Sequence, residues 1–244
     1  MAGVNAVRKL KDLPPFVLSR AESYIGTLID DLVTKGTNEP YRMMTSRSEY
    51  RLLLRQDNAD FRLTRRGYEI GLVPEERLKA VEEKYDAVQR EIKRLTHTGA
   101  SPSPRLTEFL ASKDTADAPG GAPLAALLRR PGIHYSELAP FDPDRPDLSA
   151  GIAEQVEISV KYEGYIRRQE KQVEDLRRME RHRLPPDLDY LSIQGLRLEA
   201  REKLHAVRPA DLGQAARISG VSPADVAALM IFLESMQDRQ TEKP

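Results

Sequence analysis

PEERLKAVEEKYDAVQREIKRL, residues 74–95, is the stretch that decides the fold. Its apolar side chains recur at alternating spacings of three and four residues, which is the heptad spacing of a helix seam. Pro74 suits the start of a helix, because a proline in the first turn sacrifices no backbone hydrogen bond. The seam consists of Leu78, Val81, Tyr85, Val88, Ile92 and Leu95. The sequence therefore predicts a long helix over residues 74–95.

A second seam predicts another long helix, over about residues 152–180. It consists of Tyr162, Ile166, Gln169, Val173 and Leu176. Neighbouring helices usually pack together, so we expect an antiparallel pair, although each seam could instead pack elsewhere in the protein. The connecting residues 98–150 contain SPSPR and DAPGGAP and are rich in proline and glycine. We expect them to be irregular and mobile, with short helices at about residues 104–112 and 124–130.

The remaining patterns also predict helices, so the fold class is mainly α. Ser19 and Glu22 form a capping-box pattern before a helix that runs to about Thr34. Thr64 is expected to cap a short helix, and four short helices are expected at about residues 187–191, 197–206, 209–218 and 223–235. We predict three regions: residues 1–20, a helical region over 21–184 with the insertion 98–150, and a small helical module over 185–244.

An arginine-rich segment, residues 38–66, stands out in a chain whose formal net charge is zero. It holds seven arginines and four acids, so its own balance is 7 − 4 = +3. Ser46 and Glu49 form a second capping-box pattern, which predicts a helix from Ser46 to about Arg55. On that helix Arg47, Arg51 and Arg55 would share one face, where their guanidinium groups could bind phosphates bidentately. The alternative is that these arginines pair with carboxylates of the same protein.

The chain resembles the C-terminal half of the MnmG (GidA) family, flavoenzymes that modify the wobble uridine of certain tRNAs. The resemblance lies in YIGTLIDDLVTKG (24–36), EPYRMMTSRSEYRLLLRQDNADFRLT (39–64), KYEGYIRRQ (161–169) and LPPDLDYLSIQGLRLEAREKLHAVRPADLGQAARISGVSPADVAAL (184–229). AGVNA at residues 2–6 resembles the end of another family signature. Residues 97–150 resemble no family segment.

The resemblance implies a fragment. Family members carry a glycine-rich dinucleotide fingerprint and catalytic cysteines, whereas this sequence has no GxGxxG and no cysteine. We therefore expect residues 1–20 to be the end of the flavin domain with a linker, and the fragment itself to hold no cofactor and no catalytic residue. For the full-length family the resemblance implies FAD, NADH and a methylene-folate donor, with tRNA and the GTPase MnmE as partners and a possible homodimer.

Two sets of site residues follow from this resemblance. The tRNA-binding candidates are Arg42, Arg47, Arg51, Arg55, Arg62, Arg65, Arg66, Lys161, Arg167 and Arg168. The candidates for binding the GTPase are Gln214, Ile218, Val221, Val226, Leu229, Met230 and Leu233. Independently of the resemblance, one residue of the acidic doublet Asp30–Asp31 is expected to be solvated and the other to pair with an arginine of the predicted basic helix.

Two other functions stay open from the sequence. The chain could be a structural or dimerisation module whose arginines form internal ion pairs. Residues 214–229 also resemble a helix-turn-helix DNA reader, but the expected recognition helix has no lysine or arginine and contains Asp225.

Composition excludes several classes of protein. The absence of cysteine excludes disulfides and thiolate metal sites, and the four histidines show no metal-ligand spacing. No apolar run approaches the length of a membrane-spanning helix, and the N-terminus MAGVNAVRKL lacks the apolar core of a signal peptide. We expect a cytoplasmic protein.

Overall fold

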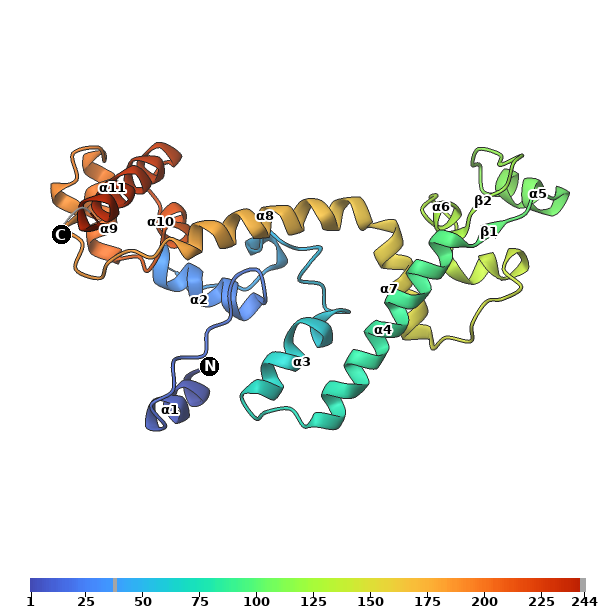
Figure 1. The fold of residues 1–244 in the computed structure, drawn as a ribbon, viewed down its shortest axis with the longest axis horizontal. Coiled ribbons are helices and arrows are strands. Elements are labelled where there is room, and N and C mark those ends of the chain that lie inside the picture. The colour runs from blue at the N-terminus through green and yellow to red at the C-terminus, as the bar shows by residue number, and fades with distance from the viewer. Residues whose placement is uncertain (37–38, 242–244) are drawn as a thin grey trace. The chain divides into compact units, whose positions relative to one another are not determined.

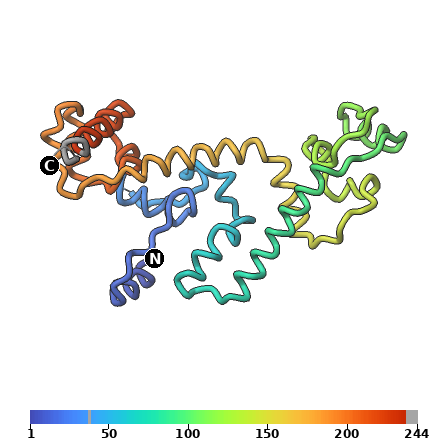
Figure 2. The backbone as a smooth tube through the Cα atoms, viewed as in Figure 1, coloured from blue at the N-terminus to red at the C-terminus, as the bar shows by residue number. Residues whose placement is uncertain are grey.

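The computed structural model describes residues 1–36 and 39–241 of the 244-residue chain. Most of these residues are helical, which confirms the predicted mainly α class. Contacts divide the chain into two compact units (Figures 1 and 2). Unit 1 comprises Met1–Leu54 and Gln169–Pro244, and unit 2 comprises Arg55–Arg168. The region boundary that we predicted near residue 184 falls inside unit 1.

Unit 2 is built on the helix that the opening heptad pattern predicted. This helix, α4, spans Glu75–His97 after Pro74, and its seam residues Leu78, Val81, Val88 and Leu95 are buried. It packs against α3 (Ala59–Glu69) and α7 (Ala150–Lys161). α3 begins five residues before Thr64, which lies inside the helix instead of capping it.

The predicted second long helix is divided at Tyr162, whose backbone leaves helical geometry. α7 ends at Lys161, and α8 spans Glu163–Arg181. α7 packs on the core of unit 2, whereas Val173 and Leu176 of α8 belong to a cluster of unit 1. The predicted second long helix therefore contributes to two separate cores, Val156 and Val160 of α7 to one and Val173 and Leu176 of α8 to the other.

α4 packs against α7, the N-terminal part of the predicted second long helix, as expected. The two helices are not antiparallel, so the predicted direction is wrong. The short helix α6 (Leu124–Leu128) lies at the end of α4, because the Leu124 N–H donates to the Thr98 carbonyl at 2.9 Å. Directly after α6, Arg129 pairs at 2.6 Å with Glu163, which lies two residues beyond the end of α7. The C-terminal ends of α4 and α7 are therefore on the same side (Figure 1).

The insertion is a packed structure and not the irregular segment that its prolines suggested. It contains β1 (Gly99–Ala100), α5 (Pro104–Ser112), β2 (Ala122–Pro123), α6 and the 3-10 helix η2 (Tyr135–Phe141). β1 and β2 pair antiparallel, with Gly99 opposite Pro123. The core that the insertion shares with α4 and α7 contains Leu106, Leu110, Leu124, Leu127, Leu128 and Ile133, all at most 1% exposed. Two prolines of the insertion occupy helix starts, where a proline is compatible with the fold. Pro104 follows the cap Ser103 at the start of α5, and Pro123 directly precedes α6.

Unit 1 combines N-terminal and C-terminal segments. It contains α1 (Ala2–Leu10), α2 (Tyr24–Thr34), the 3-10 helices η1 (Thr45–Arg47) and η3 (Tyr190–Ser192), α9 (Leu198–Val207), α10 (Leu212–Arg217) and α11 (Pro223–Thr241). Ser23, not Ser19, caps α2, because its hydroxyl accepts the Gly26 N–H at 2.9 Å. The C-terminal helices pack around Tyr190, Leu204, Leu212 and Leu229.

Candidate nucleic-acid interface

Residues 39–54, which we call the arginine loop, do not form the predicted α-helix. Thr45–Arg47 makes one turn of 3-10 helix, Ser48 is extended, and a turn follows at residues 51–54. The capping box predicted at Ser46 is therefore wrong, and Arg47, Arg51 and Arg55 do not share a helical face. The physical cause is tertiary: Tyr50 and Leu54 are buried against Val173 and Leu176 of α8.

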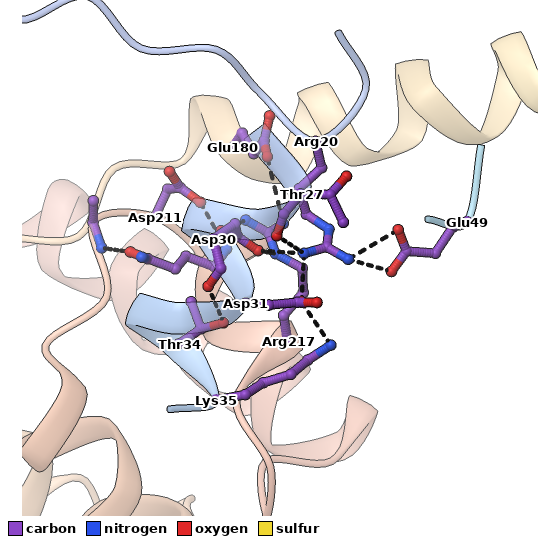
Figure 3. A network of polar contacts seen from close by, with 12 residues as sticks. Arg20, Thr27, Asp30, Asp31, Thr34, Lys35, Glu49, Glu180, Asp211 and Arg217 are labelled. Carbon is purple, nitrogen blue, oxygen red and sulfur yellow. Dashed lines mark hydrogen bonds and ion pairs between the residues drawn. The ribbon is translucent and has the colours of Figure 1, made fainter. Parts of the chain in front are cut away.

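A buried arginine holds this loop in place. The Arg20 side chain is 2% exposed, and its guanidinium donates to Asp31 at 2.7 Å, to Asp30 at 3.0 Å and to Glu49 at 2.8 and 3.1 Å (Figure 3). Burial alone would lower the pKa of Arg20, but the bonds to Glu49 and Asp31 raise it instead, so the guanidinium stays charged. Glu49, which we expected to cap a helix, is thus the loop's ionic anchor.

A second arginine joins this cluster from α10. Arg217 donates twice to Asp30, at 2.8 Å each, and contacts Glu180 of α8 at 3.4 Å (Figure 3). Burial raises the pKa of Glu180, while the charge of Arg217 opposes that change. The acidic doublet therefore pairs with Arg20 and Arg217, and the expected pairing with the predicted basic helix is wrong.

Two neutral side chains fix the loop further. The Tyr41 hydroxyl donates to Asp31 at 2.6 Å. Gln169 of α8 accepts the N–H groups of Leu52 and Leu53 at 3.1 and 3.2 Å, and its amide nitrogen donates to the Glu49 carbonyl at 3.3 Å. The sequence pattern places Gln169 in the second helix seam, whereas in the structure it satisfies backbone groups of the loop.

The predicted tRNA-binding residues fall into two groups. Arg42, Arg47 and Arg51 are exposed on the loop, and within the described residues none forms an ion pair with a carboxylate. Arg47 instead lies over the Tyr41 ring, 5.1 Å from its centroid. Arg20 and Arg217 pair with the acidic doublet, whereas Arg42, Arg47 and Arg51 lie on the exposed surface of the loop.

The other candidates belong to unit 2 and mostly have partners inside the protein. The ion pairs are Arg55–Asp57, Arg65–Glu82, Arg66–Glu69, Lys161–Glu157 and Arg167–Glu163, while Arg62 donates to Asn58. Arg168 is exposed. Most of these residues therefore form ion pairs or hydrogen bonds inside the protein, which is the alternative that the sequence left open.

The candidate partner-binding residues are divided between core and surface. Ile218 and Leu229 are buried, and Val221 and Leu233 pack on the same cluster. Met230 is 38% exposed, and its neighbour Ile231, which the sequence did not single out, is 64% exposed. Gln214 accepts the Ala210 N–H at 2.6 Å, and Val226 is half-buried.

Asp225 has a structural role that the helix-turn-helix reading did not foresee. It is 2% exposed, accepts from Arg197 at 2.6 Å and accepts the Ser222 N–H at 2.8 Å. The bond from Arg197 holds the pKa of Asp225 far below its usual range. The start of α11 is therefore occupied by an internal ion pair and offers no cation to a duplex.

The described part of the chain holds no cluster of metal-ligating side chains. It also contains no helix with the length and apolarity needed to cross a membrane.

Comparisons with known proteins identify the class. Residues 75–170 match the model of the "tRNA modifying enzyme MnmG/GidA C-terminal helical domain", and residues 172–244 match that of the "C-terminal helical bundle" of the same enzyme. The class is thus the C-terminal helical domains of a tRNA-modifying enzyme. The chain belongs to the MnmG/GidA family.

Individual relatives agree with the family models. The chain is 50% identical over 240 residues to the tRNA uridine 5-carboxymethylaminomethyl modification enzyme MnmG of Lachnoclostridium phytofermentans, covering 98% of this chain and 38% of the relative. The MnmG of Caldicellulosiruptor saccharolyticus is also 50% identical, over 96% of this chain and 37% of the relative. The crystal structure of Aquifex aeolicus GidA in form II has a TM-score of 0.81 and 39% identity, covering 95% of this chain and 36% of that one. The chain therefore spans little more than a third of the relatives' length.

Proposed function

We propose that this chain is the tRNA-binding C-terminal part of a flavoenzyme that modifies the wobble uridine of tRNA. The observation that carries this proposal is the arginine loop, with Arg42, Arg47 and Arg51 exposed above a buried ion cluster. Arginine is the side chain best suited to phosphate, because its planar fork donates two parallel hydrogen bonds. The relatives named above act on tRNA uridine by name, which supports an RNA as the polyanion.

The way the loop is held supports binding over a purely structural role. A flexible loop would lose conformational entropy when it ordered on RNA, whereas this loop is already fixed by Arg20, Tyr41 and Gln169. The ion pairs that stabilise unit 1 use Arg20 and Arg217. Arg42, Arg47 and Arg51 are not needed for those pairs, so an internal structural role does not account for them.

The test is binding of a labelled tRNA to the 244-residue chain at two salt concentrations, with the variant Arg47→Glu/Arg51→Glu. Removing two phosphate contacts should weaken binding at least tenfold and reduce the slope of log affinity against log salt by about 1.4 to 1.8. The matched control is Arg77→Glu/Arg90→Glu, which makes the same charge change at exposed positions of α4.

Equal losses in both variants would mean that only net charge matters and would overturn the assignment to the loop. Unchanged binding in the loop variant would do the same. Binding to duplex DNA with equal affinity would favour a general polyanion site over a tRNA site.

The activity of the whole enzyme is part of the same proposal. A longer protein that contains this chain would use FAD and NADH in its flavin domain, with the GTPase MnmE as its partner. We place the GTPase contact on α11, where Met230 and Ile231 are exposed and apolar. The variant Met230→Glu/Ile231→Glu should reduce capture of the GTPase at least tenfold, while Leu198→Glu, at an apolar residue of α9 that is 71% exposed, should not. Full capture by the α11 variant would refute this placement.

A further inference from the structure

A small basic pocket opens beside the arginine loop. Its volume is about 300 Å³, and its lining includes Lys35, Tyr41, Arg42, Met44 and Arg47. This volume is at the lower end of roughly 300 to 1,000 Å³ for ligand pockets, and it is too small to admit a base-paired duplex. The pocket therefore fits one small anionic group and a ring, not a groove-filling helix.

The aromatic wall of this pocket is held rigidly. The Tyr41 hydroxyl donates to Asp31 at 2.6 Å, and Asp31 is itself held by Arg20 and by Lys35 at 3.0 Å. Burial and the neighbouring Asp31 carboxylate raise the pKa of Tyr41 to about 12, so the hydroxyl keeps its proton and its bond at neutral pH. The ring thus cannot turn away without breaking a charge-assisted hydrogen bond.

The charges around the ring favour a single phosphate. The cations are Lys35, Arg42 and Arg47, and the acids are Asp31 and Glu39, so the lining has a balance of 3 − 2 = +1. Asp31 is already paired with Arg20 and Lys35, so the other charged groups of the lining are Arg42, Arg47 and Glu39, two cations and one acid. Arg47 is also 5.1 Å from the Tyr41 ring centroid, so cation and aromatic face are adjacent.

We propose that this pocket binds one unpaired nucleotide of the RNA, with its base stacked against Tyr41 and its phosphate held by Arg42 and Arg47. An aromatic face next to a guanidinium is the combination that recognises unstacked bases in single-stranded RNA. Met44, 52% exposed, offers a polarisable apolar surface to the same base. This inference rests on the proposed function and adds to it that the loop reads an unpaired nucleotide and does not only hold the backbone.

The test compares two RNA probes on the full 244-residue chain. One is a labelled anticodon stem-loop hairpin, and the other is a blunt RNA duplex of the same nucleotide count. Tyr41→Leu removes the stacking face, and Tyr41→Phe keeps the ring but loses the bond to Asp31. Tyr68→Leu, at an exposed tyrosine of α3, is the matched control.

We expect Tyr41→Leu to weaken hairpin binding by roughly fivefold to a hundredfold, the range for losing one base–aromatic stack. Its binding to the duplex should be unchanged, Tyr41→Phe should stay within about threefold of the parent, and Tyr68→Leu should match the parent. Tyr41→Trp adds a direct signal, because the chain has no tryptophan and a stacked base should quench its fluorescence.

Three outcomes would overturn the inference. Equal losses on both probes would show that Tyr41 supports the loop and does not stack on a base. A loss in Tyr41→Phe as large as in Tyr41→Leu would assign the effect to the hydrogen bond with Asp31. Displacement of the hairpin by FAD or ADP in the parent, but not in Tyr41→Leu, would assign the pocket to a cofactor nucleotide.

The inference and the proposed function can fail separately. If Arg47→Glu/Arg51→Glu abolishes hairpin binding while Tyr41→Leu does not change it, the loop binds tRNA and the nucleotide pocket is refuted. If neither variant changes binding, both are refuted.

Discussion

Replacing Arg20 with methionine tests whether the buried ion cluster holds the arginine loop. Methionine has a similar length but no charge, so the change strands three carboxylates that Arg20 contacts in the folded protein. Glu49 is 51% exposed and can be rehydrated, while Asp30 keeps Arg217 as a partner. Asp31 is only 4% exposed, so the loss of Arg20 should destabilise the protein mainly at this carboxylate, although Lys35 and Tyr41 remain as its partners.

The expected loss of stability in Arg20→Met depends on the partners that remain to the three carboxylates. Removing one partner of a buried ion pair costs about 3 to 5 kcal/mol, and the remaining partners of Asp30 and Asp31 put Arg20→Met near the lower end, at about 3 kcal/mol. In urea unfolding followed by far-ultraviolet circular dichroism, the midpoint should fall by about 1 to 3 M at an unchanged slope. The loop would also lose its anchor at Glu49, so tRNA affinity should fall even though no exposed arginine has changed.

The matched control is Arg178→Met. Arg178 is 66% exposed on α8, and its distances to Glu174 and Asp175 are 4.0 and 3.9 Å. Exposed pairs of this kind contribute little, so the loss should stay below about 0.5 kcal/mol. A loss below about 1 kcal/mol for Arg20→Met, or losses that do not differ between the two variants, would refute the argument that the cluster holds the loop.

Two further predictions concern acid stability and the insertion. Burial of Asp31 opposes ionisation, but bonds from Tyr41, Lys35 and Arg20 lower its pKa from 3.8 to about 2. The ionised Asp31 carboxylate therefore adds roughly 2 kcal/mol to the free energy of unfolding, because the unfolded state binds the proton more readily. This stabilisation is complete above about pH 4 and is lost as the pH falls towards 2. Urea unfolding across that range should show a flatter pH dependence for Asp31→Asn than for the parent. Leu127 is fully buried in the insertion, so Leu127→Ala should lower the free energy of unfolding by about 2 to 5 kcal/mol. The control Leu72→Ala, at a residue that is 69% exposed, should change it by less than about 0.5 kcal/mol. Equal effects of the two changes would contradict a packed insertion.

Local sequence signals predicted helices well where the partners needed are close in sequence. α4 begins directly after Pro74, as its apolar spacing and first-turn proline predicted, and its seam is buried. The insertion shows the opposite case. SPSPR and DAPGGAP read as loops by composition, but the leucines between the prolines meet α4 and α7, and that packing is not visible in a local pattern.

The candidate site was found by composition but was wrong in geometry. A surplus of arginine in residues 38–66 and the family resemblance were enough to point to phosphate binding. The predicted stripe of Arg47, Arg51 and Arg55 assumed a helix. That helix is absent because Tyr50 and Leu54 pack against α8 and because Glu49 accepts from Arg20, 29 residues away in the chain, and does not cap a helix. Among the described residues of the arginine loop, the exposed arginines without an ion pair to a carboxylate are instead Arg42, Arg47 and Arg51.

The sequence by itself determined the helical class and the start of α4, because both depend on the order of residues along a short stretch. It also determined the family, because long blocks of sequence match it. Only the tertiary structure decided which arginines are free to bind. Gln169 bonds Leu52, 117 residues away, and Arg217 bonds Asp30, 187 residues away. A charged side chain is neutralised by whichever opposite charge folding brings within about 4 Å, and that neighbour is set by packing rather than by spacing along the chain.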